Sequence, residues 1–210
     1  MRARAPRVLS PRRIDMAFFR SVSLSEPVPV IDGHGVMLRA PVMGDYAEWA
    51  ALREQSRAFL TPWEPTWPAD DLTRSAFRRR LRRYTEDQRN DQAYAYFLFR
   101  SGDQVLIGGL TLANMRRGVA QAGSLGYWIG APYARRGYMT AAVTALVPYA
   151  FSTLRLHRVE AACIPTNAAS ISLLEKTGFE REGYAREYLC INGQWQDHLL
   201  FARLRDSARR

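Results

Sequence analysis

Two consecutive arginines and a glycine stand where a predicted strand gives way to a predicted helix, in the stretch GYWIGAPYARRGYMTAAV at residues 126–143. A helix that begins at or just before Gly137 presents unpaired backbone N–H groups and the positive end of its dipole, which together bind anions. Arg135 and Arg136 add charge, and the glycine lets the backbone approach a ligand closely. The same residues also fit an exposed turn. The spacing is neither the GxxxxGK of a Walker loop nor the GxGxxG of a dinucleotide site.

Cysteine and histidine, the other residue types that often do chemistry, are few and scattered. Cys163 and Cys190 lie in apolar stretches without CxxC spacing, so we expect two buried thiols of a reducing compartment rather than a disulfide or metal pair. His157 and His198 have no partner at HxxxH or HxH spacing, so we expect structural hydrogen bonds from both. The sequence predicts no metal site.

The order of the strands and helices that must position these residues predicts a single α/β domain without internal repeats. In it, a mixed sheet is flanked by helices. The predicted strands are residues 35–42, 93–100, 104–114, 122–130, 157–165, 179–191 and 194–204. The predicted helices are residues 43–55, 70–88, 137–154 and 167–178. We expect Asp45 and Asn167 to cap helices, Pro148 to kink the third helix, and Asn192-Gly193 to form the last hairpin turn.

Length and composition agree with one folded domain. A chain of 210 residues with 47% hydrophobic residues can bury a substantial core. No apolar run approaches the ~18 residues needed to cross a bilayer, so we expect a soluble, cytoplasmic protein. We divide the chain into a basic, disordered N-terminal arm, residues 1–28, and a folded domain, residues 29–206. Met16 is an alternative start.

The chain is strongly basic, with a net charge of +10 in which Lys176 is the single lysine. Arginines are concentrated in residues 1–20 and in the sequence RRRLRR at 78–83. This balance favours an acidic partner such as a phosphate cofactor, RNA or an acidic protein. Solubility combined with arginine-biased codon usage explains it equally well.

Three motifs follow one another at spacings that place all of them around one sheet. They are GYWIGAPYARRGYMTAA (126–142), IPTNAASISLLEKTGFEREG (164–183) and REYLCINGQWQDH (186–198). With these motifs the chain resembles the GNAT acyl-CoA N-acyltransferases, and within them the RimJ type of ribosomal-protein-alanine N-acetyltransferases. The resemblance covers about residues 35–205 and extends to TPWEP at 61–65 and MRRG at 115–118.

The resemblance implies the GNAT fold, with acetyl-CoA as donor. Against the family's Q/R-x-x-G-x-G/A pyrophosphate motif, the chain reads ARRGYM at 134–139, so the central glycine is kept while Ala134 lacks the usual polar side chain. We expect the backbone contacts to survive and the two arginines to supply the missing charge. The pantetheine arm would pair with the strand ending at 127–129, which splays from the strand at 157–164. The implied cofactor contacts are Tyr127, Trp128, Ile129, Arg135, Arg136, Gly137, Tyr138, Met139, Thr140, Asn167 and Ser170.

Acetyl transfer needs a neutral amine held beside the thioester, a donor for the oxyanion and a partner for the leaving thiolate. A protein α-amine has a pKa of ~8, so a modest base and good positioning suffice for direct attack in a ternary complex. Related transferases have an acidic residue proposed as base at the position of Glu187; Glu160 is the weaker alternative, acting through water. Many relatives use a tyrosine at the position of Leu174, so Ser170 is the substitute candidate to hydrogen-bond the thiolate. The backbone N–H of Ile129 is the expected oxyanion donor.

These catalytic assignments have structural alternatives. Glu187 also fits a solvent-facing carboxylate, and Ser170 a structural helix serine. The proline-rich loop at 59–68 carries Trp63, Glu64 and Trp67, which would form a wall and an acidic handle for the acceptor, or would only pack the loop on the core.

The expected function is therefore acetyl transfer to the N-terminal α-amine of a protein, a ribosomal one by the resemblance. The rival enzyme activity is acetylation of a small amine such as an antibiotic, a polyamine or an amino acid. A third hypothesis is a non-catalytic module that binds acyl-CoA or RNA, and incidental RNA contact by the RRRLRR helix fits either enzyme as well. The protein is expected to be a monomer or homodimer.

Overall fold

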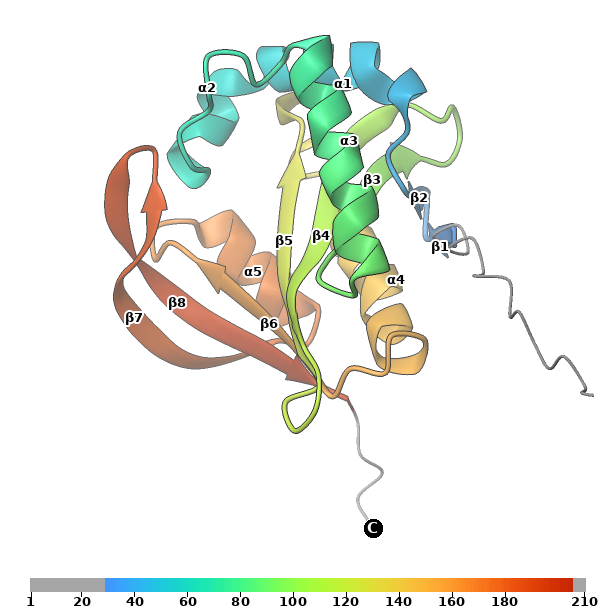
Figure 1. Ribbon diagram of the computed structural model, residues 1–210. Coiled ribbons are helices and arrows are strands. Elements are labelled where there is room, and N and C mark those ends of the chain that lie inside the picture. Colours follow the sequence, from blue (N-terminus) through green and yellow to red (C-terminus); the bar gives the residue numbers. More distant parts are fainter. Residues whose placement is uncertain (1–28, 206–210) are drawn as a thin grey trace, which may run out of the picture.

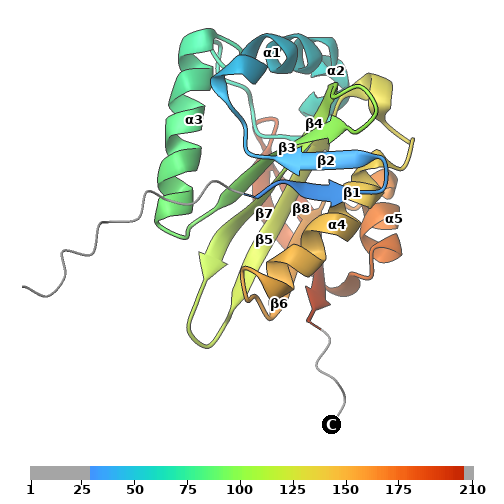
Figure 2. The ribbon, with the colours of Figure 1, turned by 90° about the vertical axis from the view of Figure 1, so that its right-hand side faces the viewer.

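The structure, a computed structural model, describes residues 29–205; the expected arm at 1–28 lies outside them. An eight-stranded sheet lies at the centre with helices on both faces (Figures 1 and 2), as the sequence predicts. The strands are β1 (Ile31–Gly33), β2 (Val36–Arg39), β3 (Tyr94–Arg100), β4 (Leu106–Arg116), β5 (Ala122–Ile129), β6 (Arg158–Cys163), β7 (Glu180–Ile191) and β8 (Gln194–Leu204). The helices are α1 (Tyr46–Gln55), α2 (Arg57–Leu60), α3 (Arg74–Arg89), α4 (Tyr138–Ser152) and α5 (Ala168–Lys176), with short 3-10 turns η1 (Met43–Asp45), η2 (Thr61–Trp63) and η3 (Ala131–Tyr133).

The sheet has the strand order β1-β2-β3-β4-β5-β6-β8-β7, and every neighbouring pair is antiparallel except β5 and β6. The parallel β5–β6 ladder is short: it joins only residues 122–124 to residues 158–160. Both strands continue beyond it, so they diverge toward their C-terminal ends (Figure 1). The sheet therefore contains a splayed junction at its middle, as expected from the resemblance.

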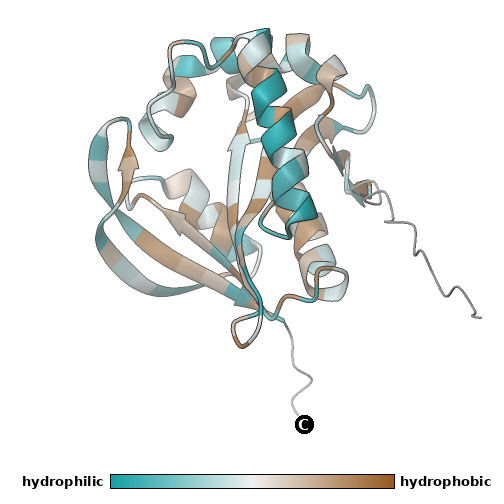
Figure 3. Ribbon diagram, viewed as in Figure 1, coloured by the Kyte–Doolittle hydropathy of each residue, from teal (hydrophilic) through white to brown (hydrophobic). Residues whose placement is uncertain are grey.

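Helix α4 covers one face of the sheet because its apolar residues recur every three or four positions. Its buried residues Ala142, Val143, Leu146, Val147 and Ala150 pack into the larger core cluster with strand residues from β2, β3, β4 and β6. The helix continues past Pro148 to Ser152. A second cluster on the opposite face holds α1 and α3 against the sheet. The outer surface of α3 is strongly hydrophilic (Figure 3).

The closing hairpin confirms the sequence prediction, since β7 and β8 are joined at Asn192 and Gly193. Both turn residues have positive φ, 46° and 77°, which is the conformation that an Asn-Gly turn adopts between two strands.

Several details differ from expectation. Strand β1 was not predicted, and part of the proline-rich loop is helical, as α2 and η2. Asp45 precedes α1 but makes no side-chain cap there; its carboxylate binds Arg39 instead, at 2.6 Å and 2.9 Å. Cys163 is buried as predicted, but Cys190 is exposed, because β7 is an edge strand that has solvent on both sides.

Helix α3 starts later than predicted. Its N-cap is Thr73, whose hydroxyl accepts a hydrogen bond from the backbone N–H of Ala76 at 3.2 Å. The aspartates expected at the helix start instead form ion pairs with arginines one to two turns into the helix: Asp70 with Arg79 and Asp71 with Arg80. Within residues 29–205, no helix is long and apolar enough to cross a membrane.

Candidate active site

The N-terminus of α4 has the backbone geometry expected of an anion cradle, the name used here for residues 135–140. Gly137 is the N-cap with φ of 80°, a left-handed conformation that glycine adopts without strain. The first helical hydrogen bond runs from the N–H of Ala141 to the carbonyl of Gly137 at 2.9 Å, so the N–H groups of residues 138–140 have no helical acceptor. Arg135, also with positive φ (60°), and Arg136 are exposed beside them. The cradle thus combines free donors, the helix dipole and two positive charges.

An open groove of about 610 Å³ adjoins this cradle. It runs along the first two turns of α4 and is closed by the β1–β2 turn on one side and the C-terminal end of α5 on the other. Its lining residues are Asp32, Gly33, His34, Gly137, Thr140, Ala141, Thr144, Ala145 and Lys176. The sequence reasoning missed this groove because β1 was not predicted, and without β1 nothing placed His34 near Lys176.

The outer edge of β5 offers unpaired backbone groups. The N–H of Gly130 donates to the carbonyl of Ile107 on β4 at 2.8 Å. Because antiparallel pairs alternate, Trp128 also bonds to β4, while the N–H and C=O groups of Tyr127 and Ile129 point to the other side, toward β6. The β5–β6 ladder has already ended there. An extended ligand carrying amides can therefore pair with this edge, and the Ile129 N–H is available as an oxyanion donor.

Tyr127 and Ser170 meet across the splayed junction, with their hydroxyl oxygens 2.7 Å apart. Asn167 caps α5 by accepting a hydrogen bond from the backbone N–H of Ser170 at 3.1 Å. Burial raises the pKa of Tyr127 and also that of the neighbouring Cys163 thiol. Leu174 is fully buried in the core, so the position that carries a tyrosine in many relatives contributes no hydroxyl here.

Glu187 lies at an irregularity in β7, where the register with β8 shifts between residues 185 and 189. Its φ is 45°, uncommon for a residue other than glycine, and its backbone N–H donates to Oδ1 of Asp197 at 2.8 Å. The hydroxyl of Tyr184 donates to the other oxygen of Asp197. Both hydrogen bonds lower the pKa of Asp197, and the bond from Tyr184 has the larger effect. The bulge sets the direction in which the exposed Glu187 side chain leaves the strand.

The carboxylate of Glu160, the weaker base candidate, is engaged in ion pairs with two arginines. Its two carboxylate oxygens bind Arg116 at 2.5 Å and Arg158 at 2.8 Å. Arg158 also pairs with Glu182 on β7. Glu160 is thus part of an ion-pair network that joins β4, β6 and β7, whereas no ion pair engages Glu187 within the described residues.

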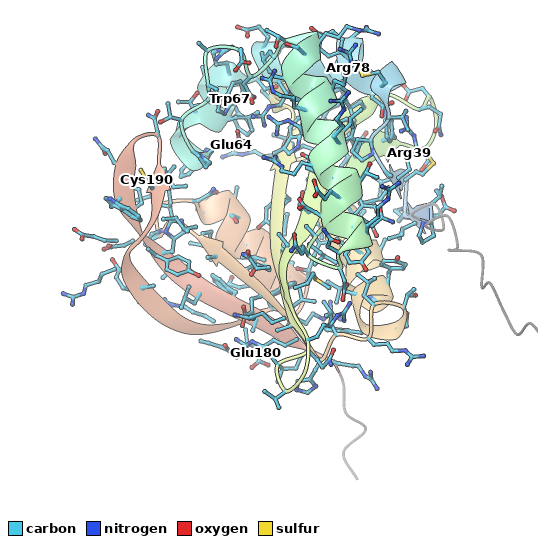
Figure 4. All side chains as sticks on the ribbon, in the orientation of Figure 1. Arg39, Glu64, Trp67, Arg78, Glu180 and Cys190 are labelled. Carbon is cyan, nitrogen blue, oxygen red and sulfur yellow. The ribbon has the colours of Figure 1, made fainter. Side chains whose placement is uncertain are left out.

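The predicted acceptor loop, residues 59–68, is held by Arg53 of α1, whose role was not predicted from the sequence. Both guanidinium NH groups of Arg53 donate to Glu64 at 2.7 Å, and the indole N–H of Trp67 donates to the same carboxylate at 2.7 Å. Figure 4 labels Glu64 and Trp67. The guanidinium lies 4.0 Å from the ring centroid of Trp67 and 5.0 Å from that of Trp128. The backbone carbonyl of Glu64 accepts from the N–H of Asn192 at the hairpin tip, at 2.9 Å. A substrate ammonium would have to share the Glu64 carboxylate with three N–H donors from Arg53 and Trp67.

The histidines behave differently from each other. His198 is buried, and its Nδ1 lies 2.9 Å from the carbonyl of Gln196, consistent with the structural hydrogen bond expected of it. His157 is exposed, and its side chain makes no hydrogen bond within residues 29–205. No group of three or more metal-ligating side chains occurs in that range.

The cradle, the open strand edge, the Tyr127–Ser170 pair and the hairpin surround one feature, the splayed junction between β5 and β6. A mixed sheet that opens beside the N-terminus of a helix defines the acyl-CoA N-acyltransferase fold. Residues 36–180 match the acetyltransferase (GNAT) domain family, and the chain belongs to this family.

Relatives of known name agree with this assignment. The [ribosomal protein uS5]-alanine N-acetyltransferase of Escherichia coli is 38% identical over 148 residues, which cover 70% of this chain and 76% of the relative. A ribosomal-protein-S5-alanine acetyltransferase from Vibrio fischeri superimposes with a TM-score of 0.80 at 29% identity, covering 87% of this chain and all of its own. Mycobacterium smegmatis RimJ, in complex with CoA-disulfide, gives 0.79 at 27% identity over 87% of this chain and 88% of that one.

Proposed function

We propose that the protein transfers the acetyl group of acetyl-CoA to the N-terminal α-amine of a ribosomal protein, by direct attack in a ternary complex. The observation that carries the proposal is the unpaired edge of β5 at residues 127–129 beside the anion cradle of α4. One feature fits the amides of a pantetheine arm and the other its pyrophosphate. The names of the Escherichia coli and Vibrio fischeri relatives support the acceptor class.

Acetyl-CoA would bind from the cradle outward in two directions. The pyrophosphate accepts from the N–H groups of residues 138–140, and Arg135 and Arg136 replace the polar side chain that Ala134 lacks. Pantetheine amides pair with Tyr127 and Ile129. The adenosine and its 3′-phosphate follow the groove along α4, where Lys176 supplies a positive charge.

The chemistry requires little beyond positioning. The neutral amine attacks the thioester carbonyl, and the Ile129 N–H stabilises the oxyanion. Glu187 accepts the proton that the amine loses, directly or through water. The carbon–sulfur bond then breaks, its electron pair moves to sulfur, and the Ser170 hydroxyl donates a hydrogen bond to the thiolate.

A polypeptide acceptor fits the exposed aromatic residues on the acceptor side. Trp63 of the acceptor loop is more than a third exposed, and Tyr188 and Trp195 of the hairpin are 47% and 65% exposed. The hairpin tip and the loop are joined by the Asn192–Glu64 hydrogen bond. Exposed aromatic side chains on two connected segments are typical of a protein-binding surface.

Helix α3 favours an additional contact with RNA. Arg78, Arg82 and Arg83 are exposed and have no ion pair within residues 29–205 (Figure 4 labels Arg78). Residues four apart on a helix are neighbours, so the pair Arg78 and Arg82 costs stability unless an anion lies between them. RNA around a ribosomal acceptor would provide that anion, and binding would then weaken steeply with salt.

The deciding experiment supplies acetyl-CoA and measures the release of free CoA thiol with a panel of acceptors. The panel contains peptides beginning with Ala or Ser, the same peptides with blocked N-termini, and polyamines, aminoglycosides and free amino acids. We expect turnover only with unblocked peptides, and a mass increase of one acetyl group on the N-terminal residue. Turnover only with small amines would contradict the peptide acceptor. Tight CoA binding without any turnover would favour a non-catalytic module.

A further inference from the structure

The contact between Tyr127 and Ser170 joins the cofactor strand to the helix that carries the proposed thiolate donor. The two hydroxyl oxygens are 2.7 Å apart, although the residues are separated by 43 positions in the sequence. Tyr127 lies on the unpaired edge of β5, and Ser170 is in the first turn of α5. Their pairing thus spans the junction at which the reacting sulfur of the cofactor would lie, a placement that rests on the proposed function.

A pair of hydroxyls can be hydrogen-bonded in two ways. If Ser170 donates to Tyr127, the serine proton is used up and cannot reach a sulfur atom. If Tyr127 donates to Ser170, the serine proton is free to point elsewhere. Burial raises the pKa of Tyr127, so the phenol remains protonated and can act as donor throughout the neutral range.

A developing thiolate selects between these two arrangements. A negative sulfur attracts the Ser170 proton, and the serine oxygen then has both lone pairs available to accept from the tyrosine. In such a chain each hydrogen bond polarises the next, and hydrogen bonds to a charged acceptor are the strong ones. We propose that Tyr127 is a positioning residue that directs the Ser170 hydroxyl toward the leaving thiolate, replacing the function of the tyrosine that is absent at Leu174.

The step needs no proton from either residue. The carbon–sulfur bond breaks and its electron pair goes to sulfur, while the two hydroxyls only donate hydrogen bonds. The thiolate takes its proton from water after release. Tyr127 does not touch the reacting atoms in this scheme, so its effect must pass through Ser170.

That dependence gives a double-mutant test with Tyr127→Phe, Ser170→Ala and the combined variant. We expect Tyr127→Phe to lower kcat by about 2- to 10-fold, the usual effect of losing a hydrogen bond between two neutral groups. We expect the KM for acetyl-CoA to change little, because the cradle and the strand edge are intact. The combined variant should be no slower than Ser170→Ala. Multiplicative effects of the two substitutions would overturn the proposal. Tyr84→Phe on α3 is the control tyrosine.

A second measurement does not depend on the acceptor at all. The ultraviolet absorbance of the thiolate reports the pKa of the CoA thiol in its complex with the protein, and a parallel titration with desulfo-CoA subtracts the protein's own groups. We expect the bound thiol to have a lower pKa in the wild type than in either single variant. An equal thiol pKa in all three complexes would refute the proposal even if peptide acetylation is observed. A lowered wild-type value without any acetylated acceptor would support it and contradict the acceptor assignment instead.

Discussion

The carboxylate of Asp197 accepts a hydrogen bond from the backbone N–H of Glu187 at 2.8 Å, across the two strands of the closing hairpin. This contact holds Glu187 at a φ of 45° in the middle of a strand. Backbone strain of this kind persists only when the surrounding structure enforces it, and it is common at functional sites. The relationship explains how an exposed edge strand can fix the direction of one carboxylate.

Asp197→Ala should therefore lower the activity without unfolding the protein. The alanine leaves the Glu187 N–H without its acceptor, the bulge relaxes, and the carboxylate moves. We expect kcat to fall toward the ~10²-fold loss that an ångström-scale misplacement causes. Asp197→Asn keeps an oxygen acceptor and should retain most of the rate. Equal activity of the two variants would show that the hydrogen bond has no positioning role.

Replacing the proposed base should change the pH dependence as well as the rate. Glu187→Gln removes the proton acceptor, and general base catalysis contributes about 10²- to 10⁴-fold to a rate. We expect kcat to fall by about 10²-fold, the lower end, because an α-amine is already partly neutral near pH 7. The remaining activity should rise with pH over about pH 6 to 9, as the free amine loses its proton. Glu180→Gln, at the start of the same strand, is the control. An unchanged rate throughout this range eliminates Glu187 as the base.

Replacing both cradle arginines tests the phosphate site. Arg135→Ala combined with Arg136→Ala should weaken acetyl-CoA binding, by about 10-fold for each charge-assisted hydrogen bond lost, with little change in the KM for the peptide. The matched double substitution Arg78→Ala and Arg82→Ala on α3 removes the same charge elsewhere and should leave cofactor affinity unaltered. Calorimetric titration with CoA measures both. If the cradle variant binds CoA with the affinity of the wild type, these arginines belong to an ordinary exposed turn and not to a phosphate site.

The ion pair between Arg53 and Glu64 should contribute to the free energy of unfolding. Arg53→Ala removes the two guanidinium donors to Glu64, leaving the Trp67 indole N–H, and it removes one stacking partner of Trp67. We expect a loss of about 3 kcal/mol in the free energy of unfolding, at the lower end for breaking a buried pair, because Glu64 keeps 20% of its side chain exposed. Urea denaturation measures it. Arg57→Ala, which breaks an exposed pair with Glu54, should have a much smaller effect. Equal losses in both variants would contradict the burial argument.

The two thiols should react at different rates. Burial raises the pKa of Cys163, so its thiol stays protonated at about pH 8, whereas alkylation requires the thiolate. Cys190 is exposed and should be modified first. Because the folded state favours the protonated thiol, the stability that Cys163 contributes is complete below the unfolded pKa of ~8.5. It is lost as the pH rises above that value and through the raised pKa of the folded state. Mass spectrometry after brief iodoacetamide treatment checks the order, and Cys190→Ser should abolish the fast phase.

Those parts of the fold that depend on local pattern could be predicted from the sequence. The hairpin of β7 and β8 follows from alternating residues on either side of Asn192-Gly193, and the cap of α5 follows from Asn167 alone. Predictions failed where tertiary partners compete with local preference. Asp70 and Asp71 would each suit a helix start, yet arginines further along α3 bind both.

The candidate site divides in the same way. The cradle is a local motif, so its residues could be named from the sequence. The partners of the proposed catalytic residues could not. Tyr127 of β5 reaches Ser170 of α5 across the splayed junction, and Asp197 reaches Glu187 only because a bulge shifts the register. Arg53 is eleven positions from Glu64, and nothing in the local pattern links an arginine of α1 to the loop. The catalytic roles themselves remain predictions for the experiments above.

Because the ladder between β5 and β6 is short, we expect the bound ligand to contribute to the folding free energy of the protein. The sheet consists of two parts joined by three residue pairs, and an extended cofactor arm would supply further rungs between them. A ligand present at a hundred times its Kd adds about 2.7 kcal/mol to the folded state. For such a sheet, we expect bound acyl-CoA to raise the free energy of unfolding by linking the two parts, in addition to serving as the acetyl donor.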